Sequence, residues 1–237
     1  MIVILTYNVP HRKTQDLLFQ VKLKTEKEIL VLATPMKYKK KYKPLVQHRP
    51  SKVIQVDNKV LCNKLGFTYE EISNDKLFDR LCQLQPELVL VAGAGLLDAE
   101  IVRNFFVVNS HPGKLPDVRG LDAFKWAVYN GNDIGVTLHL LDENSDGGLL
   151  IKEEIIPLYP YDTFHSAAYR QYEVEIELLS DSINLLKDVK SKNKLKKINI
   201  ENTVVNKRME HDKEKELYYK FEQRVKKLNN TGDFNEN

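Results

Sequence analysis

Apolar runs of strand length alternate along the chain with segments of helical period, and this alternation restricts the fold more than any other feature. Strands are predicted over residues 2–5, 29–33, 53–56, 88–92, 106–109 and 135–141. Near-continuous apolar strands separated by helices are typical of a parallel sheet with helices on both faces. The pattern therefore predicts an α/β fold with a Rossmann-like, mostly parallel sheet flanked by helices.

Helices are predicted where apolar side chains recur every three or four residues, over 14–24, 75–84, 164–186 and 211–228. Thr14 and Asn74 suit the N-cap positions of the first two. A lysine-rich stretch at 187–197 has the composition of a solvated boundary. We therefore expect a main domain over 1–187, and over 188–237 a basic linker and a small helical extension that begins with a strand-like piece at 198–205.

Composition excludes several classes of protein. The net charge of +3 on 237 residues gives no global basic field, so DNA is not an expected partner and RNA is disfavoured. Cys62 and Cys82 lack the spacing of a zinc or redox motif. The apolar start of the chain is too short for a signal peptide, and no stretch approaches the roughly twenty apolar residues of a membrane span. We expect a cytoplasmic protein with no membrane partner.

An amide, an imidazole and a carboxylate lie at the ends of predicted strands. Asn109 and His111 are two residues apart, so on an extended strand their side chains face the same way, and Pro112 then fixes the backbone. Asp146 precedes two glycines, which permit a tight loop. Such groups can stabilise an oxyanion and remove a proton from an amine, as acyl transfer requires.

The carboxyl ends of strands in an open α/β sheet are where ligands bind. We expect the loops at 93–97, 109–113 and 142–148 to meet at that edge. Each residue also has a plain structural interpretation: His111 as a turn histidine, His139 as a core histidine and Asp146 as a turn former. A metal site of these three residues lacks any compact ligand spacing, so none is expected.

Three stretches together resemble the folate-dependent formyltransferase family: Asn-Ser-His-Pro-Gly-Lys-Leu-Pro-Asp-Val-Arg-Gly at 109–120, Gly-Val-Thr-Leu-His at 135–139 and Asp-Glu-Asn-Ser-Asp-Gly-Gly at 142–148. The resemblance is strong over 86–187 and weak before Pro86, and it looks closest to the sugar-nucleotide N-formyltransferases. It implies that 1–187 is a catalytic domain and that 10-formyltetrahydrofolate is the co-substrate.

The resemblance also implies roles for individual residues. Asn109 and His111 would bind the formyl oxygen, Asp146 would order His111 and a water and help remove the amine proton, and His139 would support this group. The donor would contact Gly95, Leu96, Leu97, Leu141, Asp142, Glu143, Asn144 and Ser145. The loop at 92–97 departs from the family pattern because a shorter link joins it to Asn109.

The acceptor amine depends on separate features. Trp126 is expected on a helix that borders the acceptor side, although it could equally pack that helix on the sheet. Basic side chains interleaved with tyrosines at 37–43, and the segment that follows, could grip a phosphate, although a charge run is also typical of a solvated loop. The candidate acceptor residues are Trp126, Arg119, Lys39, Lys41, His48 and Arg49. The run at 11–13 is a further candidate for phosphate at a helix start.

These features favour a nucleotide-linked amino sugar as the small-molecule acceptor. Glycinamide ribonucleotide or another small amine is the alternative. Only about fifty residues follow the core, whereas methionyl-tRNA formyltransferases carry a C-terminal barrel, so a tRNA acceptor is disfavoured. Two further functions stay open. One is a formyltetrahydrofolate hydrolase, and the other is a module that binds folate or nucleotide without turnover. The apolar face of the helix at 211–228 could cover the core or a second subunit, which leaves a homodimer open.

Overall fold

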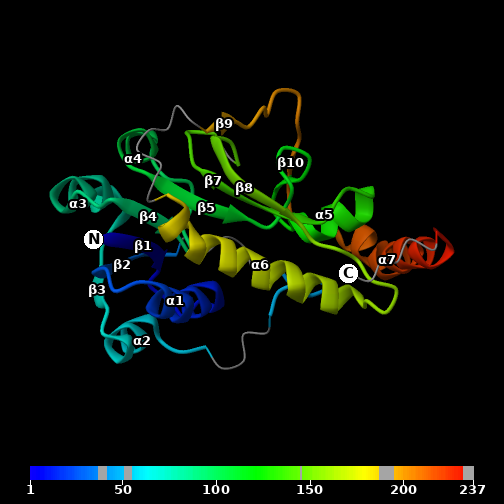
Figure 1. Cartoon of the computed structure of the whole chain (residues 1–237), viewed down its shortest axis with the longest axis horizontal. Coiled ribbons are helices and arrows are strands. Elements are labelled where there is room, and N and C mark those ends of the chain that lie inside the picture. The colour runs from blue at the N-terminus through cyan, green and yellow to red at the C-terminus, as the bar shows by residue number, and fades with distance from the viewer. Residues whose placement is uncertain (37–41, 51–54, 145, 187–194, 232–237) are drawn as a thin grey trace.

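The computed structural model describes residues 1–36, 42–50, 55–144, 146–186 and 195–231, which are arranged around one large mixed sheet (Figure 1). Among these residues, eight strands form the sheet in the order β3-β2-β1-β4-β5-β7-β8-β9. The five strands at the β3 end of this order, β3, β2, β1, β4 and β5, are all parallel. Next to β5, the strands β7, β8 and β9 each pair antiparallel with the strand before them in the sheet. The predicted mostly parallel sheet flanked by helices is therefore confirmed.

The strands are β1 (Ile2–Tyr7), β2 (Ile29–Thr34), β3 (Thr68–Glu71), β4 (Leu88–Val91), β5 (Val107–His111), β6 (Arg119–Gly120), β7 (Gly135–Leu140), β8 (Leu149–Ile155), β9 (Lys196–Lys197) and β10 (Val205–Asn206). The helices are α1 (Arg12–Lys24), α2 (Asn58–Leu65), α3 (Leu77–Leu84) after a 3₁₀ turn at Asn74–Lys76, α4 (Ala99–Asn104), α5 (Ala123–Asn130), α6 (Phe164–Leu185) and α7 (His211–Thr231).

Most predicted elements lie within three residues of the observed ones, and the exceptions have physical reasons. The strand predicted over 53–56 is not found at residues 55 and 56, while 53 and 54 lie outside the described residues; the strand that pairs with β2 is β3. β3 is an edge strand with partly or fully exposed polar side chains, so no apolar run marks it. The strand predicted over 198–205 is wrong except at its last residue, which begins β10.

The sheet has a different core on each face because side chains alternate along every strand. On one face, residues such as Ile4, Leu90 and Val108 pack with α1, α2, α5, α6 and α7. On the other face, Val3, Val89 and their equivalents pack with α3 and α4. The second cluster is centred on β1, β2 and β4 and includes Val107 of β5, and beyond Val107 this face of β5 and β7 carries polar side chains.

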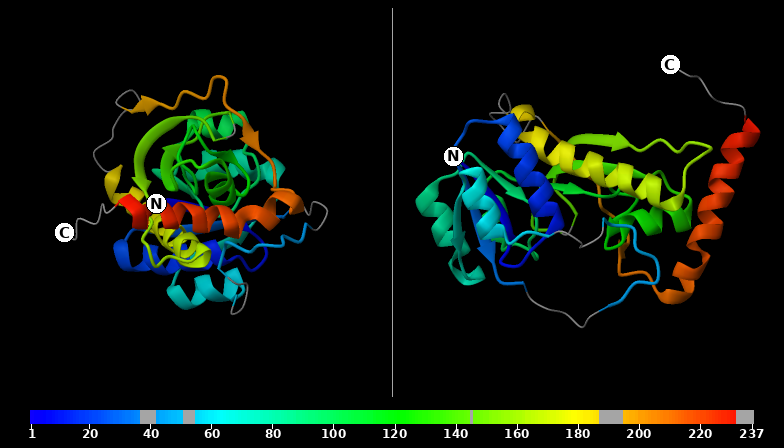
Figure 2. Two further views of the ribbon diagram at one scale, coloured as in Figure 1. Left: turned by 90° about the vertical axis from the view of Figure 1, so that its right-hand side faces the viewer. Right: turned by 90° about the horizontal axis from the view of Figure 1, so that it is seen from below.

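Helix α7 is part of the first core. Its buried residues Leu217, Phe221 and Val225 belong to the same apolar cluster as the inner face of α5. Lys125 of α5 and Glu214 of α7 form an ion pair in which neither side chain is more than 1% exposed. Figure 2 shows α7 lying across the end of the molecule where α5 is found. No helix in the described ranges is long and apolar enough to cross a membrane.

Candidate active site

Strand β5 carries Asn109 and His111 on one side. Val107, two residues earlier, packs in the core formed with α3 and α4, so all three side chains belong to that face of the sheet. β7 pairs antiparallel with β5 and sets His139 directly opposite Asn109. An amide and two imidazoles therefore share one face of two neighbouring strands.

His139 orients the amide of Asn109. His139 is fully buried, and burial lowers its pKa to about 4, so the ring is neutral near neutral pH. Its Nδ1 lies 2.8 Å from the carbonyl oxygen of Gly147 and must carry the proton, since a carbonyl only accepts. Nε2 is then an acceptor, and Asn109 donates to it from Nδ2 at 3.3 Å. The second N–H of the Asn109 amide is directed elsewhere.

Asp146 reaches His111 from the loop between β7 and β8. Its Oδ1 lies 3.3 Å from His111 Nδ1, and its Oδ2 accepts a hydrogen bond from the amide of Gly120 at 2.6 Å. Because β7 is antiparallel, this loop starts beside Val108, at the opposite end of β5 from His111. The expectation that the loop at 142–148 follows a carboxyl edge shared with the other two is therefore wrong: the loop instead folds back over the face of β5.

Gly148, the second glycine after Asp146, is required by the path of this loop, and Gly147 leaves room for the Asp142 side chain. Gly148 has φ +106°, and a Cβ there would overlap the carbonyl oxygen of Leu140. A Cβ at Gly147 would lie 2.7 Å from Asp142 Oδ1. Asp146 itself has φ +52°, in the left-handed region. The tight turn that presents the carboxylate thus depends on close approach of the loop to its own backbone.

The ring of His111 is held from two sides. His111 is 4% exposed, its Nε2 lies 2.8 Å from the carbonyl oxygen of Val118, and its Nδ1 faces Asp146. A Cβ at Gly113 would lie 2.6 Å from the Val118 oxygen and 2.9 Å from His111 Nε2, so only glycine fits there. Both ring nitrogens therefore face oxygen atoms, an arrangement suited to handling a proton between an imidazole and a carboxylate.

Two buried polar side chains that the sequence did not single out hold the turn after β5. Thr137 Oγ1 donates to the carbonyl oxygen of Gly113 at 2.9 Å and accepts from the amide of Leu115 at 3.0 Å. Gln171 on α6 donates to the carbonyl oxygen of Pro112 at 3.0 Å. The threonine follows the same alternation as the histidine two residues later and could have been found from it. The glutamine lies within an apolar helix stripe and carries no such signal.

A chain of charges connects β5 to α1 and α6. Lys13 donates to the carbonyl oxygen of Ser110 at 3.2 Å and pairs with Glu175 at 2.8 Å. Glu175, which is 1% exposed, also pairs with Arg49. Burial opposes ionisation of this carboxyl, but Arg49 and Lys13 lower the pKa of Glu175 to about 2. Lys13 and Arg49, two of the cations expected to bind a phosphate, therefore share Glu175 as a buried counter-ion.

The residues expected to contact the donor lie on two loops beside this face. Leu97 and Leu141 are partly buried against the core formed with α3 and α4. Leu96 between β4 and α4 is 87% exposed, which leaves an apolar side chain available to an apolar ligand surface. Nothing lies within 4 Å of a Cβ placed on Gly95.

The other donor candidates organise the loop after β7. Asp142 accepts hydrogen bonds from the backbone and side-chain nitrogens of Asn144, at 2.8 and 3.2 Å. Glu143 forms an exposed ion pair with Arg103 of α4. Ser145 lies outside the described residues.

Two of the acceptor candidates contact the C-terminal segment. The indole N–H of Trp126 donates to the carbonyl oxygen of Lys207 at 2.8 Å, and the ring lies under the ammonium group of Lys213. Arg119, which is 5% exposed, donates to Thr203 Oγ1 at 2.8 Å. The structure thus directs both side chains toward residues 203–213.

The other four candidates come from the basic segment. Lys39 and Lys41 lie outside the described residues. His48 stacks on Phe124 of α5, and burial, together with the charges of Arg49 and Lys125, lowers the pKa of His48 well below its usual value. His48 is therefore a neutral ring, and Arg49 is engaged by a buried carboxylate.

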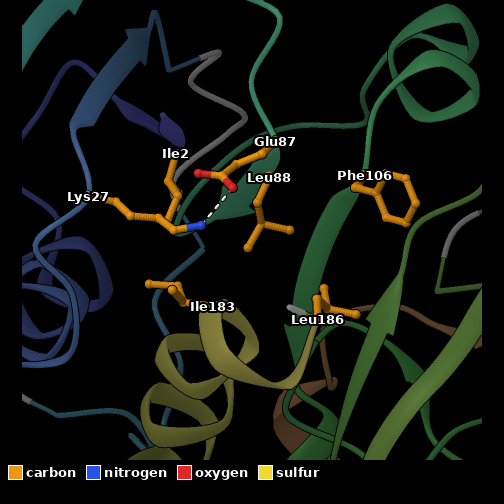
Figure 3. Close-up of a pocket in the computed structure, with 7 residues that line it drawn as sticks. All are labelled: Ile2, Lys27, Glu87, Leu88, Phe106, Ile183 and Leu186. Atoms are coloured by element: carbon orange, nitrogen blue, oxygen red, sulfur yellow. Dashed lines mark hydrogen bonds and ion pairs between the residues drawn. The ribbon is translucent and has the colours of Figure 1, made fainter. Parts of the chain in front are cut away.

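One pocket lies beside His48 and Arg49, and another lies at the far end of the sheet. One, of about 180 Å³, is lined by His48, Arg49, Pro50, His165 and Tyr169. The other, of about 210 Å³, lies at the amino ends of β1 and β4, where Figure 3 shows the ion pair of Lys27 and Glu87 among apolar side chains. The second pocket is at the end of the sheet away from His111. Within the described ranges, no three His, Cys, Asp or Glu side chains are grouped so as to hold a metal ion.

Comparison with known proteins identifies the family. Residues 2–183 match the model of the formyl transferase family. The chain is 28% identical over 132 residues to phosphoribosylglycinamide formyltransferase of Haemophilus influenzae, which covers 54% of this chain and 62% of that protein. It is 29% identical over 166 residues to methionyl-tRNA formyltransferase of Thermodesulfovibrio yellowstonii, which covers 68% of this chain and 52% of that protein. The matches thus span less than two thirds of these relatives.

Solved structures share the fold. A sugar N-formyltransferase from a Shewanella species aligns with a TM-score of 0.59 at 18% identity and covers 87% of this chain and 76% of its own. Phosphoribosylglycinamide formyltransferase from Bacillus halodurans aligns with a TM-score of 0.58 at 20% identity and covers 80% of this chain and 97% of its own.

Proposed function

This chain belongs to the formyl transferase family, and from that premise we propose that it transfers a formyl group from 10-formyltetrahydrofolate to a primary amine. One observation carries the proposal: on one face of β5 and β7, Asn109 is oriented by His139 while His111 faces Asp146. A module that only binds a ligand has no need of an amide, an imidazole and a carboxylate held in this way.

Asn109 is the residue to which we assign the formyl oxygen. When the amine attacks the formyl carbon, the C–N bond forms and the carbonyl oxygen becomes an oxyanion. Because Nδ2 already donates one hydrogen to His139, its second hydrogen is the one available to that oxygen. A donor whose orientation is fixed in advance stabilises developing charge without reorganisation.

His111 and Asp146 handle protons in this proposal. The attacking amine must lose a proton, which Asp146 accepts directly or through a water, and the tetrahedral intermediate then collapses by breaking its bond to N10 of tetrahydrofolate, which regains a proton. His111 lies between the strand and the carboxylate, with Nδ1 3.3 Å from Asp146 Oδ1. The ring of His111 also donates a hydrogen bond to the oxyanion. To do so, one ring nitrogen leaves its present oxygen partner and turns to the formyl oxygen.

The donor is expected on the loops at 93–97 and 141–145. The exposed Leu96 supports this, because an isolated leucine at a loop tip near the site gives the flat pterin an apolar surface. Backbone groups of the loop after β7 can meet the polar edge of the pterin. Asp142 and Asn144 already brace that loop against each other.

For the acceptor we propose a nucleotide-linked amino sugar. The pocket that includes His48 and Tyr169 offers aromatic surfaces for a base, and the charges of Lys13, Arg49 and Glu175 sum to a net positive charge that suits a phosphate. Arg119 and Trp126 are further acceptor candidates. Glycinamide ribonucleotide remains the main alternative, since a protein described as acting on it is among the sequence relatives.

The decisive experiment incubates the protein with 10-formyltetrahydrofolate and, separately, amino-sugar nucleotides, glycinamide ribonucleotide, methionyl-tRNA and buffer alone. We expect an amino-sugar nucleotide to gain the mass of a formyl group. Gain by another acceptor would replace the proposed substrate, and donor loss in buffer alone would indicate a hydrolase. D146N should lower kcat roughly 10²- to 10⁴-fold with donor affinity retained, whereas E100Q, an exposed carboxylate in the first turn of α4, should leave transfer intact. Equal turnover by D146N and the wild type would remove Asp146 from the reaction.

A further inference from the structure

A segment of the C-terminal extension runs beside the turn that carries Gly120. β10 pairs in parallel with β6, with Val205 opposite Arg119 and Asn206 opposite Gly120. The amide of Leu121 donates to the carbonyl oxygen of Asn206 at 2.9 Å. Two strands joined by backbone hydrogen bonds hold each other in one register, so the position of Gly120 is tied to that of Asn206.

Gly120 is pressed against this segment. It has φ +88°, and a Cβ on it would overlap the carbonyl oxygen of Asn206 and lie 2.7 Å from the amide nitrogen of the same residue. Only glycine allows the two backbones to approach in this way. The contact is therefore between backbones and does not depend on the side chain of Asn206.

The other face of Gly120 holds the catalytic carboxylate. The amide of Gly120 donates to Asp146 Oδ2 at 2.6 Å, and Asp146 Oδ1 faces His111. The backbone of Asp146 has a φ in the left-handed region. Its two carboxylate oxygens have two described contacts, which are the amide of Gly120 and the imidazole of His111. A short, charge-assisted bond to a fixed amide sets where the second carboxylate oxygen lies.

The segment is anchored independently of Asp146. Before β10, Thr203 accepts from Arg119. After β10, Asp122 accepts from the amide of Met209 at 3.1 Å and pairs with Arg208. The segment is thus fixed at both ends to the turn and to the start of α5, and it can act as a support.

We propose that residues 203–209 form a positioning element for the reaction, in which the backbone of Asn206 fixes Gly120 and the amide of Gly120 aims Asp146 at His111. This rests on the proposed function, since it assigns a positioning role toward the same carboxylate. It also makes part of the C-terminal extension necessary for the chemistry, although that part lies far along the chain from the triad.

The test compares N206P with N206A. Proline removes the backbone N–H of Asn206 from the parallel pairing of β10 with β6, whereas alanine removes only the side chain and leaves that pairing in place. We expect N206P to lower kcat roughly 10- to 100-fold at unchanged donor KM, as displacement of a catalytic group does, and N206A to resemble the wild type. In a D146N background, N206P should cause no further loss, because both changes act through one carboxylate. An equal loss in both backgrounds, or an equal effect of N206A, would overturn the proposal.

A second measurement needs no change in β10 and no turnover. In nuclear magnetic resonance spectra of D146N, the amide resonance of Gly120 should move, and in G120A the ring nitrogen resonances of His111 should move as they do in D146N. Unchanged His111 resonances in G120A would overturn the proposal even if N206P fails to fold. If the wild type formylates no acceptor but these resonances move, the positioning is supported and the proposed function fails on its own.

Discussion

Asn109 and His139 lie directly opposite each other on β5 and β7, and the side-chain amide donates to the buried ring at 3.3 Å. Because the other ring nitrogen of His139 donates to the carbonyl oxygen of Gly147, the neutral ring has one available acceptor, and it faces Asn109. The orientation of the amide is thus set by a residue that need not touch substrate.

The first prediction concerns His139→Phe, which keeps an aromatic ring of somewhat larger size and removes both hydrogen bonds of the imidazole. The Asn109 amide then loses the partner that sets its orientation, and kcat should fall roughly 10- to 100-fold with little change in donor KM. Steady-state kinetics with the donor varied would check this. A variant with wild-type kcat would show that Asn109 does not rely on His139.

The second prediction concerns stability against pH. Burial lowers the pKa of His139 to about 4 in the folded protein, below its ordinary value of about 6.5 in the unfolded chain. The unfolded state therefore binds the proton first, and the stability present above pH 6.5 is lost as the pH falls toward 4, by up to about 3 kcal/mol. Urea unfolding of the wild type across this range should show the loss, and H139F should lack that part of it. Parallel curves would contradict the assignment.

The third prediction uses two glycines in the left-handed region. G148A places a methyl group on the carbonyl oxygen of Leu140, so the loop that presents Asp146 must move and kcat should fall more than about 10-fold. G131A is the matched control, because Gly131 has φ +76° but open space around the added methyl group. It should cost about 1 kcal/mol of stability and leave kcat unchanged. Equal kinetics for the two variants would mean that the loop tolerates the displacement.

The fourth prediction concerns the buried carboxylate of Glu175. E175Q leaves Lys13 and Arg49 without their shared anion, and the free energy of unfolding should fall by about 3–5 kcal/mol. D181N on the same helix breaks the more exposed pair with Lys24 and should cost no more than about 1 kcal/mol. Urea unfolding at neutral pH separates the two cases. Similar losses would show that the buried network contributes little.

The fifth prediction tests the donor loop. L96D adds a charge to a side chain that is 87% exposed, so stability should hardly change while donor KM rises about 10-fold or more. L23D on α1, where the leucine is 82% exposed, is the control and should leave KM unchanged. Equal KM values in both variants would move the donor away from this loop.

The sequence predicted the sheet because parallel strands covered on both faces must be apolar, as β1, β2 and β4 are. It failed for β3, which has no apolar run, and for β8, in which only residues 149–151 are consecutive apolar residues before Lys-Glu-Glu. Asn109 and His111 could be assigned to one face by counting along a strand. The path of the 142–148 loop back over β5 could not be predicted, because it depends on β7 being antiparallel. Strand direction is set by which strands pair, and the local sequence does not show it.

The supports of the site were also hidden from the sequence. Gln171 and Glu175 lie in a helix stripe that otherwise reads as core, and only their contacts reveal what they hold. The contact of Asn206 with Gly120 is between backbones, so the residue types at these positions could not predict it.

The ion pair of Lys125 and Glu214 limits which C-terminal segments could replace the one in this chain. A lysine with no exposed surface in α5 depends on a carboxylate 89 residues later in the chain. A catalytic core ended at residue 187 would lose both this carboxylate and the helix that packs on α5, and Asp122, 4.0 Å from the ammonium group, would be the described counter-charge that stays. A different tail that again buried Lys125 would have to bring an acid to the same point, because an ammonium group left unpaired in the interior costs about 3–5 kcal/mol.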